Sequence, residues 1–316
     1  MKAAVICSKG IGDGLLMMVA SHRLFSRGYQ VTTYQDALHE LGRWFPDHAF
    51  KKRSSLIDLE NELSYYDLLV LQNDNSTLSK EIISLFRQGK LKSLSVFYSS
   101  YEAAKHFPLT SWDRVFSRSR PMVDNIADSI ASVLQCTQVS KNNGLVTPDG
   151  LVQSRYAKRV LIHPTSTTPL RTWSPDKFLA VADQIASRGF NVSFCVSPAE
   201  RPDWEKIAPA GIQLPHFPTL DALASHVLES GFLIGNESGT GHLASNLHIP
   251  TLIVASCEKQ MALWRPGWFA GKVLTPSRLI PNFKGSRLRE KKWQAFISPK
   301  RVVREFLAFQ KKQVKQ

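Results

Sequence analysis

The fold is decided by residues 3–16, AAVICSKGIGDGLL. Five small or branched apolar residues at 3–7 predict a buried β-strand. Three glycines follow directly, which lets the backbone turn tightly and approach a ligand. A helical pattern then runs from Asp13 to Arg27 and stops before Gly28. A strand, a glycine-rich turn and a helix in this order predict the first βαβ unit of a parallel sheet.

Strand and helix patterns alternate along the rest of the chain. In the first half, strand patterns lie at 30–33, 68–72 and 93–98, and helical patterns lie at 78–87 and 122–134. In the second half, strand patterns lie at 159–163, 191–196, 232–235 and 251–255, and helical patterns lie at 174–188, 220–228, 238–247 and from Pro299. This alternation predicts the α/β class with parallel sheets, in which ligands bind beyond the carboxyl ends of the strands.

The chain has 316 residues, which suits two domains of about 150 residues each. The stretch 138–153 has no hydrophobic periodicity and is rich in turn formers, so it is predicted to be the linker. We therefore expect an N-terminal domain over 1–145 and a C-terminal domain over 155–316 that ends in a helix. The two sheets are expected to face each other across a cleft.

The formal net charge is +14, and the cations are concentrated at 51–53, at 284–292 and in the tail from Lys311. Such an excess favours an anionic partner, which is a phosphorylated substrate, an anionic membrane surface or nucleic acid. No sequence signature of RNA or DNA binding supports nucleic acid. A basic, solvated surface without a partner is the remaining interpretation.

The segment 284–293 is the best candidate for contact with an anionic membrane, because it combines five cations with Trp293. An exposed Trp293 would suit the lipid interface, whereas a buried one would belong to the core. No apolar run approaches the ~20 residues that a membrane span requires. The first apolar stretch ends at Ser8, which is short for a signal peptide, so we interpret it as a strand and the protein as cytosolic.

Cysteine usage gives no sign of a disulfide framework or a zinc site. The chain contains four cysteines, Cys7, Cys136, Cys195 and Cys257. They are far apart in the sequence and include no C-x-x-C pair. We expect reduced, structural thiols.

Asp13 is the first candidate for chemistry, since it follows the glycine-rich turn at the start of a helix. The glycine spacing is G-x-G-x-G, which fits neither the dinucleotide-binding fingerprint nor a P-loop, so the turn is a weak nucleotide motif. A carboxylate in this place either acts as a base or only complements the helix dipole. The residues alone leave both interpretations open.

The second candidate loop, 163–174, directly follows the first strand of the second half. It contains four consecutive hydroxyl side chains at 165–168 and then Arg171. The planar fork of an arginine matches phosphate oxygens, so this segment is suited to bind a diphosphate. A hydroxyl-rich surface loop is the alternative.

The third candidate loop, 235–244, again joins a strand to a helix. Free N–H groups at a helix start attract anions, and Glu237 is able to hydrogen-bond to sugar hydroxyls. Ser238 is the natural N-cap of the helix. His242 either takes part in the site or faces the core with one internal partner.

The three loops together resemble the heptosyltransferase family of GT-B glycosyltransferases (glycosyltransferase family 9). The family's glycine-rich G-D-x-L-L loop is matched by Gly12–Leu16, and its H-P-G-A-S-…-K-x-W-P segment is matched by His163–Pro175. Its N-D-S-G-x-x-H-L-A segment, the most specific of the three, is matched by Asn236–Ala244. The order and spacing agree, and the resemblance extends over nearly the whole chain.

The resemblance implies two Rossmann-like domains of the GT-B type and an inverting glycosyltransferase without a cofactor. Asp13 would be the general base, and Arg171 would stabilise the leaving diphosphate in place of a metal ion. The implied donor-binding residues are Gly12, Thr167, Thr168, Glu237, Ser238, Gly239 and His242. The N-terminal domain would bind the acceptor and the C-terminal domain the nucleotide sugar.

The resemblance also implies the partners. The donor would be ADP-heptose, and the acceptor would be a phosphorylated, lipid-linked Kdo or heptose of the lipopolysaccharide core. Such an acceptor would place the protein in the cytoplasm, peripheral at the cytosolic face of the inner membrane.

Three departures from the family pattern affect the expected identity of the sugar more than the expected type of reaction. Arg171 replaces the usual Lys, Glu237 replaces the usual Asp, and residues 165–167 are Thr-Ser-Thr in place of Gly-Ala-Ser. Two other functions remain open: a sugar-nucleotide epimerase of the same fold, and a protein that binds a nucleotide or glycan without catalysis. The broken glycine spacing disfavours a dehydrogenase.

Overall fold

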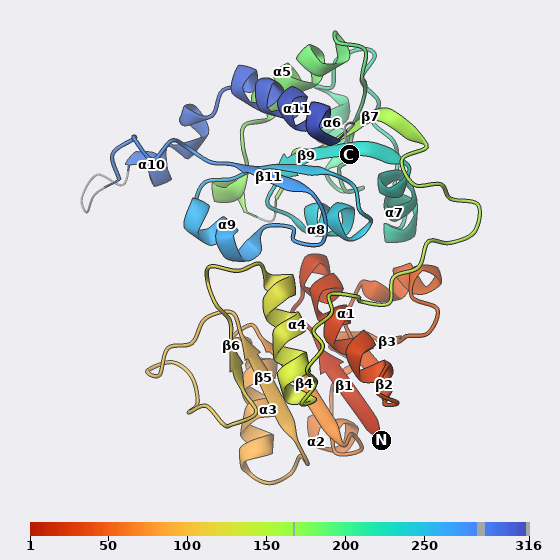
Figure 1. Cartoon of the computed structure of the whole chain (residues 1–316), viewed down its shortest axis with the longest axis vertical. Helices are drawn as coiled ribbons and strands as arrows, with labels where there is room; N and C mark the ends of the chain where they lie inside the picture. The colour runs from red at the N-terminus through yellow and green to blue at the C-terminus, as the bar shows by residue number, and fades with distance from the viewer. Residues whose placement is uncertain (167, 283–287, 314–316) are drawn as a thin grey trace. The chain divides into compact units, whose positions relative to one another are not determined.

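Two compact units make up the chain. The structure is a computed structural model that describes residues 1–166, 168–282 and 288–313. Its two units are Met1–Asp149 and Gly150–Gln316, called unit 1 and unit 2 below. Each unit contains one parallel β-sheet with helices on both faces, as Figure 1 shows. Within the described residues, no helix combines the length and the apolar character that crossing a bilayer requires.

Unit 1 is built on a six-stranded sheet in the order β3-β2-β1-β4-β5-β6. Its strands are β1 (Lys2–Ile6), β2 (Gln30–Tyr34), β3 (Ala49–Lys51), β4 (Leu68–Asn73), β5 (Leu94–Tyr98) and β6 (Arg114–Val115). Every neighbouring pair is parallel. The central strands β1, β4 and β5 are almost continuous apolar runs because helices cover both faces of the sheet.

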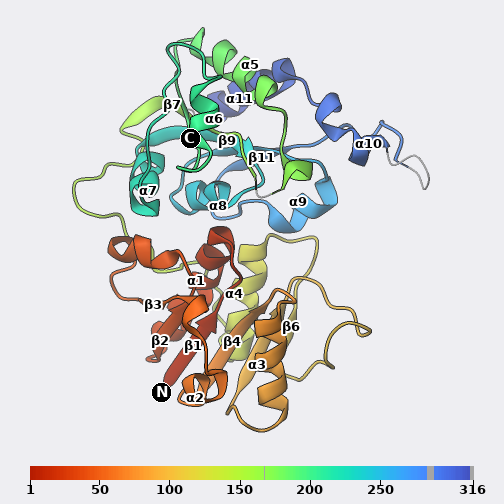
Figure 2. The ribbon, with the colours of Figure 1, turned by 180° about the vertical axis from the view of Figure 1, so that it is seen from behind.

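Helices cover both faces of the unit 1 sheet (Figures 1 and 2). On one face α1 (Ile11–Phe25) packs against α4 (Met122–Val133), and on the other lie α2 (Leu59–Leu63) and α3 (Thr77–Arg87). The 3-10 helices η1 (Leu38–Trp44) and η2 (Arg53–Ser55) follow β2 and β3. Apolar side chains of β1, β4, α2 and α3 form one buried core, to which Ile6, Leu71 and Ile82 belong.

Unit 2 is built on a five-stranded parallel sheet in the order β11-β10-β9-β7-β8. Its strands are β7 (Tyr156–His163), β8 (Asn191–Phe194), β9 (Ser230–Asn236), β10 (Thr251–Val254) and β11 (Gly271–Leu274). The first strand of the unit, β7, therefore lies between β8 and β9. This order places the loops after β7 and β9 beside each other.

Two helix pairs cover the unit 2 sheet. On one face α11 (Pro299–Gln313) packs against α5 (Pro175–Ala186), and on the other α7 (Leu220–Leu228) packs against α8 (Gly239–Asn246). The short helices are η3 (Pro169–Arg171), α6 (Arg201–Glu205), α9 (Glu258–Trp264), α10 (Leu288–Lys291) and η4 (Trp293–Phe296). The apolar stripe of α11 joins the core through Val302, Val303 and Phe306.

Trp293 is a core residue of unit 2. Its side chain is only 2% exposed, and its indole N–H donates to the carbonyl oxygen of Leu170 at 2.9 Å. The indole N–H of Trp173 donates to the carbonyl oxygen of Gln294 in return, at 3.4 Å. Of the two positions that the sequence left open for Trp293, the structure therefore confirms the core and excludes the lipid interface. Two cations of the same segment, Lys284 and Arg287, lie outside the described residues.

The predicted α/β class with parallel sheets is confirmed, and the predicted elements are present with shifted ends. The strand predicted from 159 begins at Tyr156, and the helix predicted from Asp13 begins at Ile11. Ser174 stands at the N-cap of α5, but its hydroxyl makes no capping hydrogen bond, so Pro175 provides the helix start. Elements of two to five residues, such as β6 and α2, are too short to show a period. That the two sheets face each other across a cleft stays a prediction.

The close approach of β7 and β9 depends on a glycine. A Cβ atom at Gly231 would lie 2.0 Å from the carbonyl oxygen of Ala157. We therefore expect Gly231→Ala to separate the strands and to lower the free energy of unfolding by about 1–3 kcal/mol. Gly42→Ala is the matched control, because a Cβ there meets no atom within 4 Å. Calorimetry measures both melting temperatures, and equal values would contradict this account.

Candidate functional site

In unit 1, β1 and β4 flank the point where the strand order changes direction. Open α/β sheets bind ligands at such a switch point, beyond the carboxyl ends of the strands. The loop after β1 leads into α1, whose first turn contains Asp13. Gln72 and Asn73 end β4. Polar side chains from two neighbouring strands therefore meet at one edge of the sheet.

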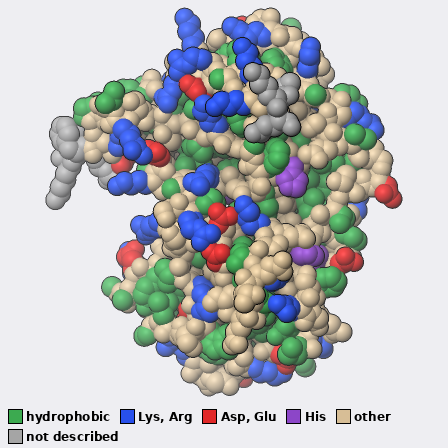
Figure 3. Space-filling model, in the orientation of Figure 1, with side chains coloured by type: hydrophobic (Ala, Val, Ile, Leu, Met, Phe, Trp, Pro, Cys, Tyr) green, Lys and Arg blue, Asp and Glu red, His purple; other side chains and the backbone are tan. Residues whose placement is uncertain are grey.

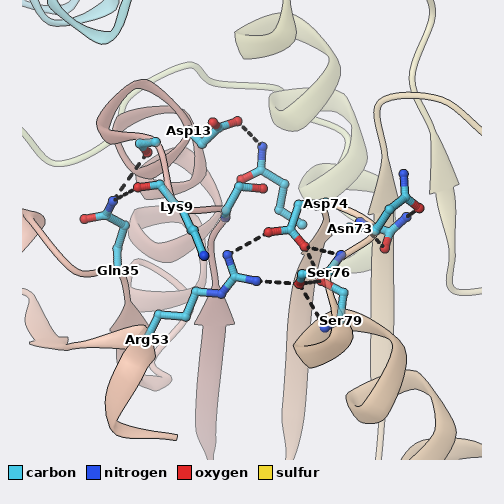
Figure 4. A network of polar contacts seen from close by, with 12 residues as sticks. Lys9, Asp13, Gln35, Arg53, Asn73, Asp74, Ser76 and Ser79 are labelled. Atoms are coloured by element: carbon cyan, nitrogen blue, oxygen red, sulfur yellow. Dashed lines mark hydrogen bonds and ion pairs between the residues drawn. The ribbon is translucent and has the colours of Figure 1, made fainter. Parts of the chain in front are cut away.

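Asp13 is anchored by a side chain from β4. The Gln72 amide donates from Nε2 to Asp13 Oδ1 at 2.6 Å, and its Oε1 accepts from the Ser8 N–H at 3.0 Å. Gln72 is buried, so both ends of its amide are held. Figure 4 shows Asp13 at the start of α1 with this hydrogen bond as a dashed line. The orientation of the carboxylate is therefore fixed from the neighbouring strand.

Gly10 leaves room for the Asp13 carboxylate. A Cβ atom at position 10 would lie 2.8 Å from Asp13 Oδ2, so any larger residue would displace that oxygen. Gln35, which is fully buried after β2, donates to the carbonyl oxygens of Lys9 at 3.0 Å and Gly10 at 3.4 Å (Figure 4). These contacts fix the glycine-rich turn. Gly12, predicted to contact the donor, is buried inside α1.

A charged network lies next to Asp13 at the same edge of the sheet (Figure 4). Arg53 is buried and donates to Asp74 Oδ2 and to Ser76 Oγ, each at 2.7 Å. Asp74 Oδ1 accepts from Ser79 Oγ at 2.7 Å. Burial alone would raise the pKa of Asp74, but the hydrogen bonds from Arg53, Ser76 and Ser79 lower it to about 2. The pair stays ionised and fixes the local field.

The pKa of Asp13 lies well above that of an ordinary aspartate. The net pKa is about 6, compared with 3.8 for an ordinary aspartate, and burial is the largest cause of the increase. The hydrogen bond from Gln72 and the charge of Arg53 lower the pKa, whereas the charge of Asp74 raises it. A carboxylate with a pKa close to the working pH accepts a proton effectively in a transition state. Asp13 therefore has the placement and the basicity that a general base requires.

In unit 2, β7 and β9 flank the corresponding switch point. Asn236 ends β9, is fully buried and joins both ends of the loop after β7. Its Oδ1 accepts from the Trp173 N–H at 3.0 Å, and its Nδ2 donates to the carbonyl oxygen of Pro164 at 2.7 Å. The second and third candidate loops are thus held together by one amide.

Arg171 and Glu237, one from each of these loops, form an ion pair. Arg171 Nη1 lies 3.6 Å from Glu237 Oε1, and Gln260 of α9 donates to the same carboxylate at 3.2 and 3.1 Å. Burial raises the pKa of Glu237, whereas the Arg171 charge and the Gln260 hydrogen bond lower it. The Arg171 side chain is half-exposed and that of Glu237 is mostly buried. The guanidinium is thus able to reach an anion in solution while the carboxylate stays in place.

The N-terminus of α8 adds backbone donors to this edge. Ser238 is its N-cap, as predicted, and accepts from the Gly241 N–H at 3.3 Å, while Gly239 is the first helical residue. His242 is buried and packs edge-on against Trp268. Burial lowers the pKa of His242 to about 4, although a hydrogen bond with the backbone of Trp264 raises it. His242 is therefore a neutral, inward-facing side chain, and donor binding through it stays a prediction.

The hydroxyl side chains after β7 have different surroundings. Thr167 lies outside the described residues. Thr165 donates from Oγ1 to Glu200 Oε2 at 3.3 Å, which joins this loop to the one after β8. Ser166 Oγ is buried and has no hydrogen-bond partner within the described part of the chain, and Thr168 is exposed. A buried hydroxyl without a partner is costly and is often satisfied by water or a ligand.

A cavity of about 650 Å³ opens at the carboxyl ends of β10 and β11. Lys259, Arg278 and Arg289 contribute cations to its lining. Arg278 donates to both oxygens of Glu258 at 2.7 Å, so one of these cations is already paired. The cavity adjoins α9, the helix that carries Gln260. In the portion of the chain that is described, no group of three or more His, Cys, Asp or Glu is arranged to hold a metal ion.

Sequence reasoning missed several residues of these sites. Gln72 and Asp74 directly follow the apolar run of β4, so the same strand-end rule that selected the other loops could have found them. Arg53 was counted in a basic surface cluster but is buried. Gln260 lies in α9, a few residues after β10, and no sequence motif includes it.

Comparison with known proteins finds a family model and relatives that resemble part of this chain. Residues 132–255 match the model of glycosyltransferase family 9 (heptosyltransferase). The predicted resemblance to the heptosyltransferase family is confirmed. Lipopolysaccharide heptosyltransferase 3 of Escherichia coli (strain K12) is 28% identical over 117 residues, which are 34% of this chain and 33% of that protein. The matched part thus spans about a third of that curated relative.

Solved heptosyltransferase structures resemble the chain over almost its full length. ADP-heptose lps heptosyltransferase II of E. coli has a TM-score of 0.72 and 17% identity, with 99% of both chains covered. E. coli heptosyltransferase WaaC with ADP-2-deoxy-2-fluoro heptose has a TM-score of 0.67 and 11% identity, with 98% of this chain and 99% of WaaC covered. These likenesses confirm the GT-B fold class. The match to the family model includes Arg171 and Glu237 but not Asp13.

The raised pKa of Asp13 predicts a pH-dependent cost to stability. Its pKa is 3.8 in an unfolded chain and about 6 in the folded one, so folding favours the protonated form. The stabilising contribution is complete below about pH 4 and is lost as the pH rises through about 6. Asp13→Asn cannot ionise, so above pH 6 it should exceed the wild type in unfolding free energy by up to about 3 kcal/mol.

Urea unfolding at about pH 4, 6 and 8 measures this difference. The gain should be absent at the lowest pH and should grow toward the highest. Asp149→Asn, which replaces an exposed carboxylate, is the control and should show no such trend. A difference that does not change with pH would show that Asp13 is not a buried, raised-pKa group.

Proposed function

We propose that this protein is an inverting, metal-independent glycosyltransferase that transfers heptose from ADP-heptose to a lipopolysaccharide core acceptor. The observation that carries the proposal is the Asp13 carboxylate at the switch point of unit 1, with a pKa of about 6 and with its orientation held by Gln72. A general base of this kind is what an acceptor hydroxyl requires for direct attack on a sugar.

The nucleotide sugar would bind to unit 2. Its diphosphate would accept hydrogen bonds from Arg171, from the backbone N–H groups at Ser238 and Gly239, and from the hydroxyls of Ser166, Thr167 and Thr168. The ion pair with Glu237 positions Arg171 at this edge, and a helix N-terminus favours an anion there. Glu237, fixed by Gln260, would hydrogen-bond to hydroxyls of the sugar.

The reaction would be one in-line displacement. The acceptor oxygen forms a bond to the anomeric carbon while the bond from that carbon to the diphosphate oxygen breaks, which inverts the configuration. The acceptor proton passes to an oxygen of Asp13. The negative charge that grows on the diphosphate is met by Arg171 and the α8 backbone, so these preorganised donors would lower the barrier.

The substrates are proposed from what is printed of the relatives. Heptosyltransferase II is described as an ADP-heptose enzyme, and WaaC is described in complex with an ADP-heptose analogue. A lipid-linked, phosphorylated acceptor agrees with the net charge of +14. We place the reaction at the cytosolic face of the inner membrane, with the protein bound peripherally.

An epimerase is the second candidate, and the ionisable Asp13 would serve it as well. The two reactions differ in what they consume. A transferase releases ADP only when an acceptor is present and yields a glycosylated acceptor, whereas an epimerase changes the sugar nucleotide without one. Mass spectrometry of the sugar nucleotide and the acceptor therefore separates them.

Arg171→Ala should weaken the binding of ADP. A charge-assisted hydrogen bond contributes about 1.5–3 kcal/mol, so the dissociation constant should rise roughly 10- to 150-fold. Arg171→Lys keeps the charge and should lose much less. Arg188→Ala, which removes an exposed arginine from the end of α5, is the matched control. Isothermal titration calorimetry decides, and an Arg171→Ala protein that binds ADP like the control would remove Arg171 from the phosphate site.

Asp13→Asn should abolish most turnover while ADP binding is retained. Loss of a general base lowers the rate by roughly 10²–10⁴. In the wild type, kcat/KM should fall as the pH drops through about 6, because protonated Asp13 cannot accept the acceptor proton. The assay is ADP release from ADP-heptose with a Kdo-containing lipid acceptor. Full turnover in Asp13→Asn would leave Asp13 as an acid that only complements the helix dipole.

A further inference from the structure

One loop of unit 1 holds an unusual share of exposed apolar side chains. Between β5 and β6, Phe107 is 37% exposed, Leu109 is 44% exposed and Trp112 is 43% exposed. Val115 in the edge strand β6 is 48% exposed. Figure 3 shows hydrophobic side chains gathered over this loop at the lower left of the view. These four residues are called the β5–β6 surface below. Large contiguous apolar groups in water mark interaction sites more often than chance.

The β5–β6 surface is held in place by hydrogen bonds to the sheet. Ser95 of β5 donates from Oγ to the carbonyl oxygen of Trp112 at 2.6 Å. Asp113 accepts from the Val96 N–H at 3.0 Å and from the Thr110 N–H at 2.8 Å. These hydrogen bonds hold Trp112 and its neighbours in a fixed conformation, so their exposure is part of the folded structure of unit 1.

The other half of the loop is fixed through aromatic and cationic contacts. Tyr101 donates from its hydroxyl to the carbonyl oxygen of Phe107 at 3.2 Å. The guanidinium of Arg87 lies 5.0 Å from the centre of the Phe107 ring, where a cation interacts favourably with the ring face. Tyr101 also stacks on His106. The exposed Phe107 thus has a defined position as well.

Cations surround these apolar groups. Residues 99–120 contain four of them, Lys105, Arg114 of β6, Arg118 and Arg120, and Arg87 of α3 lies beside Phe107. Three acids oppose these five cations: Glu102 pairs with Lys105, Asp128 of α4 pairs with Arg120, and both oxygens of Asp113 accept backbone N–H groups. The neighbourhood is therefore positively charged around an apolar centre.

The loop that carries this surface is joined to the end of β4 by a short chain of hydrogen bonds. His106 accepts from the Glu102 N–H at Nδ1 and donates from Nε2 to Asn75 Oδ1 at 2.7 Å. Asn73, next to Gln72 at the end of β4, donates to the same Asn75 oxygen at 3.1 Å. The loop begins at the carboxyl end of β5 and then turns back along that strand, so that Trp112 lies beside Ser95 near the start of β5.

We propose that the β5–β6 surface docks unit 1 onto an anionic lipid bilayer, with Trp112, Leu109 and Phe107 entering the headgroup region and the surrounding cations meeting lipid phosphates. Tryptophan prefers this interface because its ring is apolar and its N–H is polar. The proposal rests on the proposed function in one respect: the same bilayer would supply a lipid-linked acceptor.

A second copy of the chain is a weaker occupant than a lipid surface. A stable protein interface buries about 800 Å² on each partner, and four partly exposed side chains supply only a fraction of that. Positive charge on both copies would also oppose self-association, whereas it favours an anionic bilayer.

Vesicle sedimentation tests the proposal with the full-length protein. Wild-type protein should bind phosphatidylglycerol vesicles at low salt, bind phosphatidylcholine vesicles weakly, and dissociate as salt rises. Leu109→Ser with Trp112→Ser should reduce binding about tenfold or more, because the inserted apolar area is lost. Arg118→Gln, which removes an exposed cation, should reduce binding to the anionic vesicles roughly fivefold and leave the weak binding to phosphatidylcholine unchanged.

Ile57→Ser with Tyr65→Ser is the matched control, since it removes two exposed apolar side chains elsewhere in unit 1. This control should bind vesicles like the wild type. Wild-type binding in the Leu109/Trp112 variant would overturn the proposal, as would equal binding of the wild type to both lipids. A dimer in sedimentation velocity that this variant abolishes would assign the surface to a second copy instead.

ADP affinity, and transfer to a water-soluble acceptor fragment, should be unchanged in the Leu109/Trp112 variant, because neither residue belongs to the candidate site. These measurements separate the two proposals. Vesicle binding without any transferase activity would refute the proposed function alone, whereas transferase activity without vesicle binding would refute the docking surface alone.

Discussion

Parallel pairing of every strand is the constraint on which both candidate sites depend. Each parallel pair needs a crossover, so all strands of a sheet end at the same edge. In unit 1 this brings Gln72 to Asp13, 59 residues away in the sequence. In unit 2 it brings Asn236 to Trp173, 63 residues away. If β4 or β9 ran antiparallel to its neighbours, Gln72 or Asn236 would lie at the opposite edge of the sheet and would not reach Asp13 or Trp173.

Two buried amides convert this shared edge into defined geometry. An amide donates and accepts at once, so Gln72 and Asn236 each join two segments without burying a charge. A carboxylate at position 72 would repel Asp13, and one at position 236 would leave the Pro164 carbonyl oxygen without its donor. Asp13 is therefore oriented by the neutral amide of Gln72, whereas Arg171 is oriented by one ion pair with Glu237.

Local patterns were sufficient for the long elements and for the loops that follow them. The apolar run before Gly10 and the cap at Ser238 are features of a few neighbouring residues, and both have the predicted structure. The contact between Gln72 and Asp13 depends on which strands are neighbours, which no local pattern contains. The burial of Arg53 and Trp293 could not be predicted for a related reason, because a charge run and an aromatic residue look the same in sequence whether tertiary packing buries them or not.

The hydrogen bond from Trp293 to the loop after β7 has a consequence for chimeras made from similar proteins. The segment by which family relatives are recognised ends at residue 255, yet Trp293 holds Leu170, and Gln294 holds Trp173. The support for the loop after β7 is thus encoded outside the segment that matches the family model. A chimera that exchanged only that segment between similar proteins would separate the loop from its support, so an exchange that keeps the loop's conformation has to include η4.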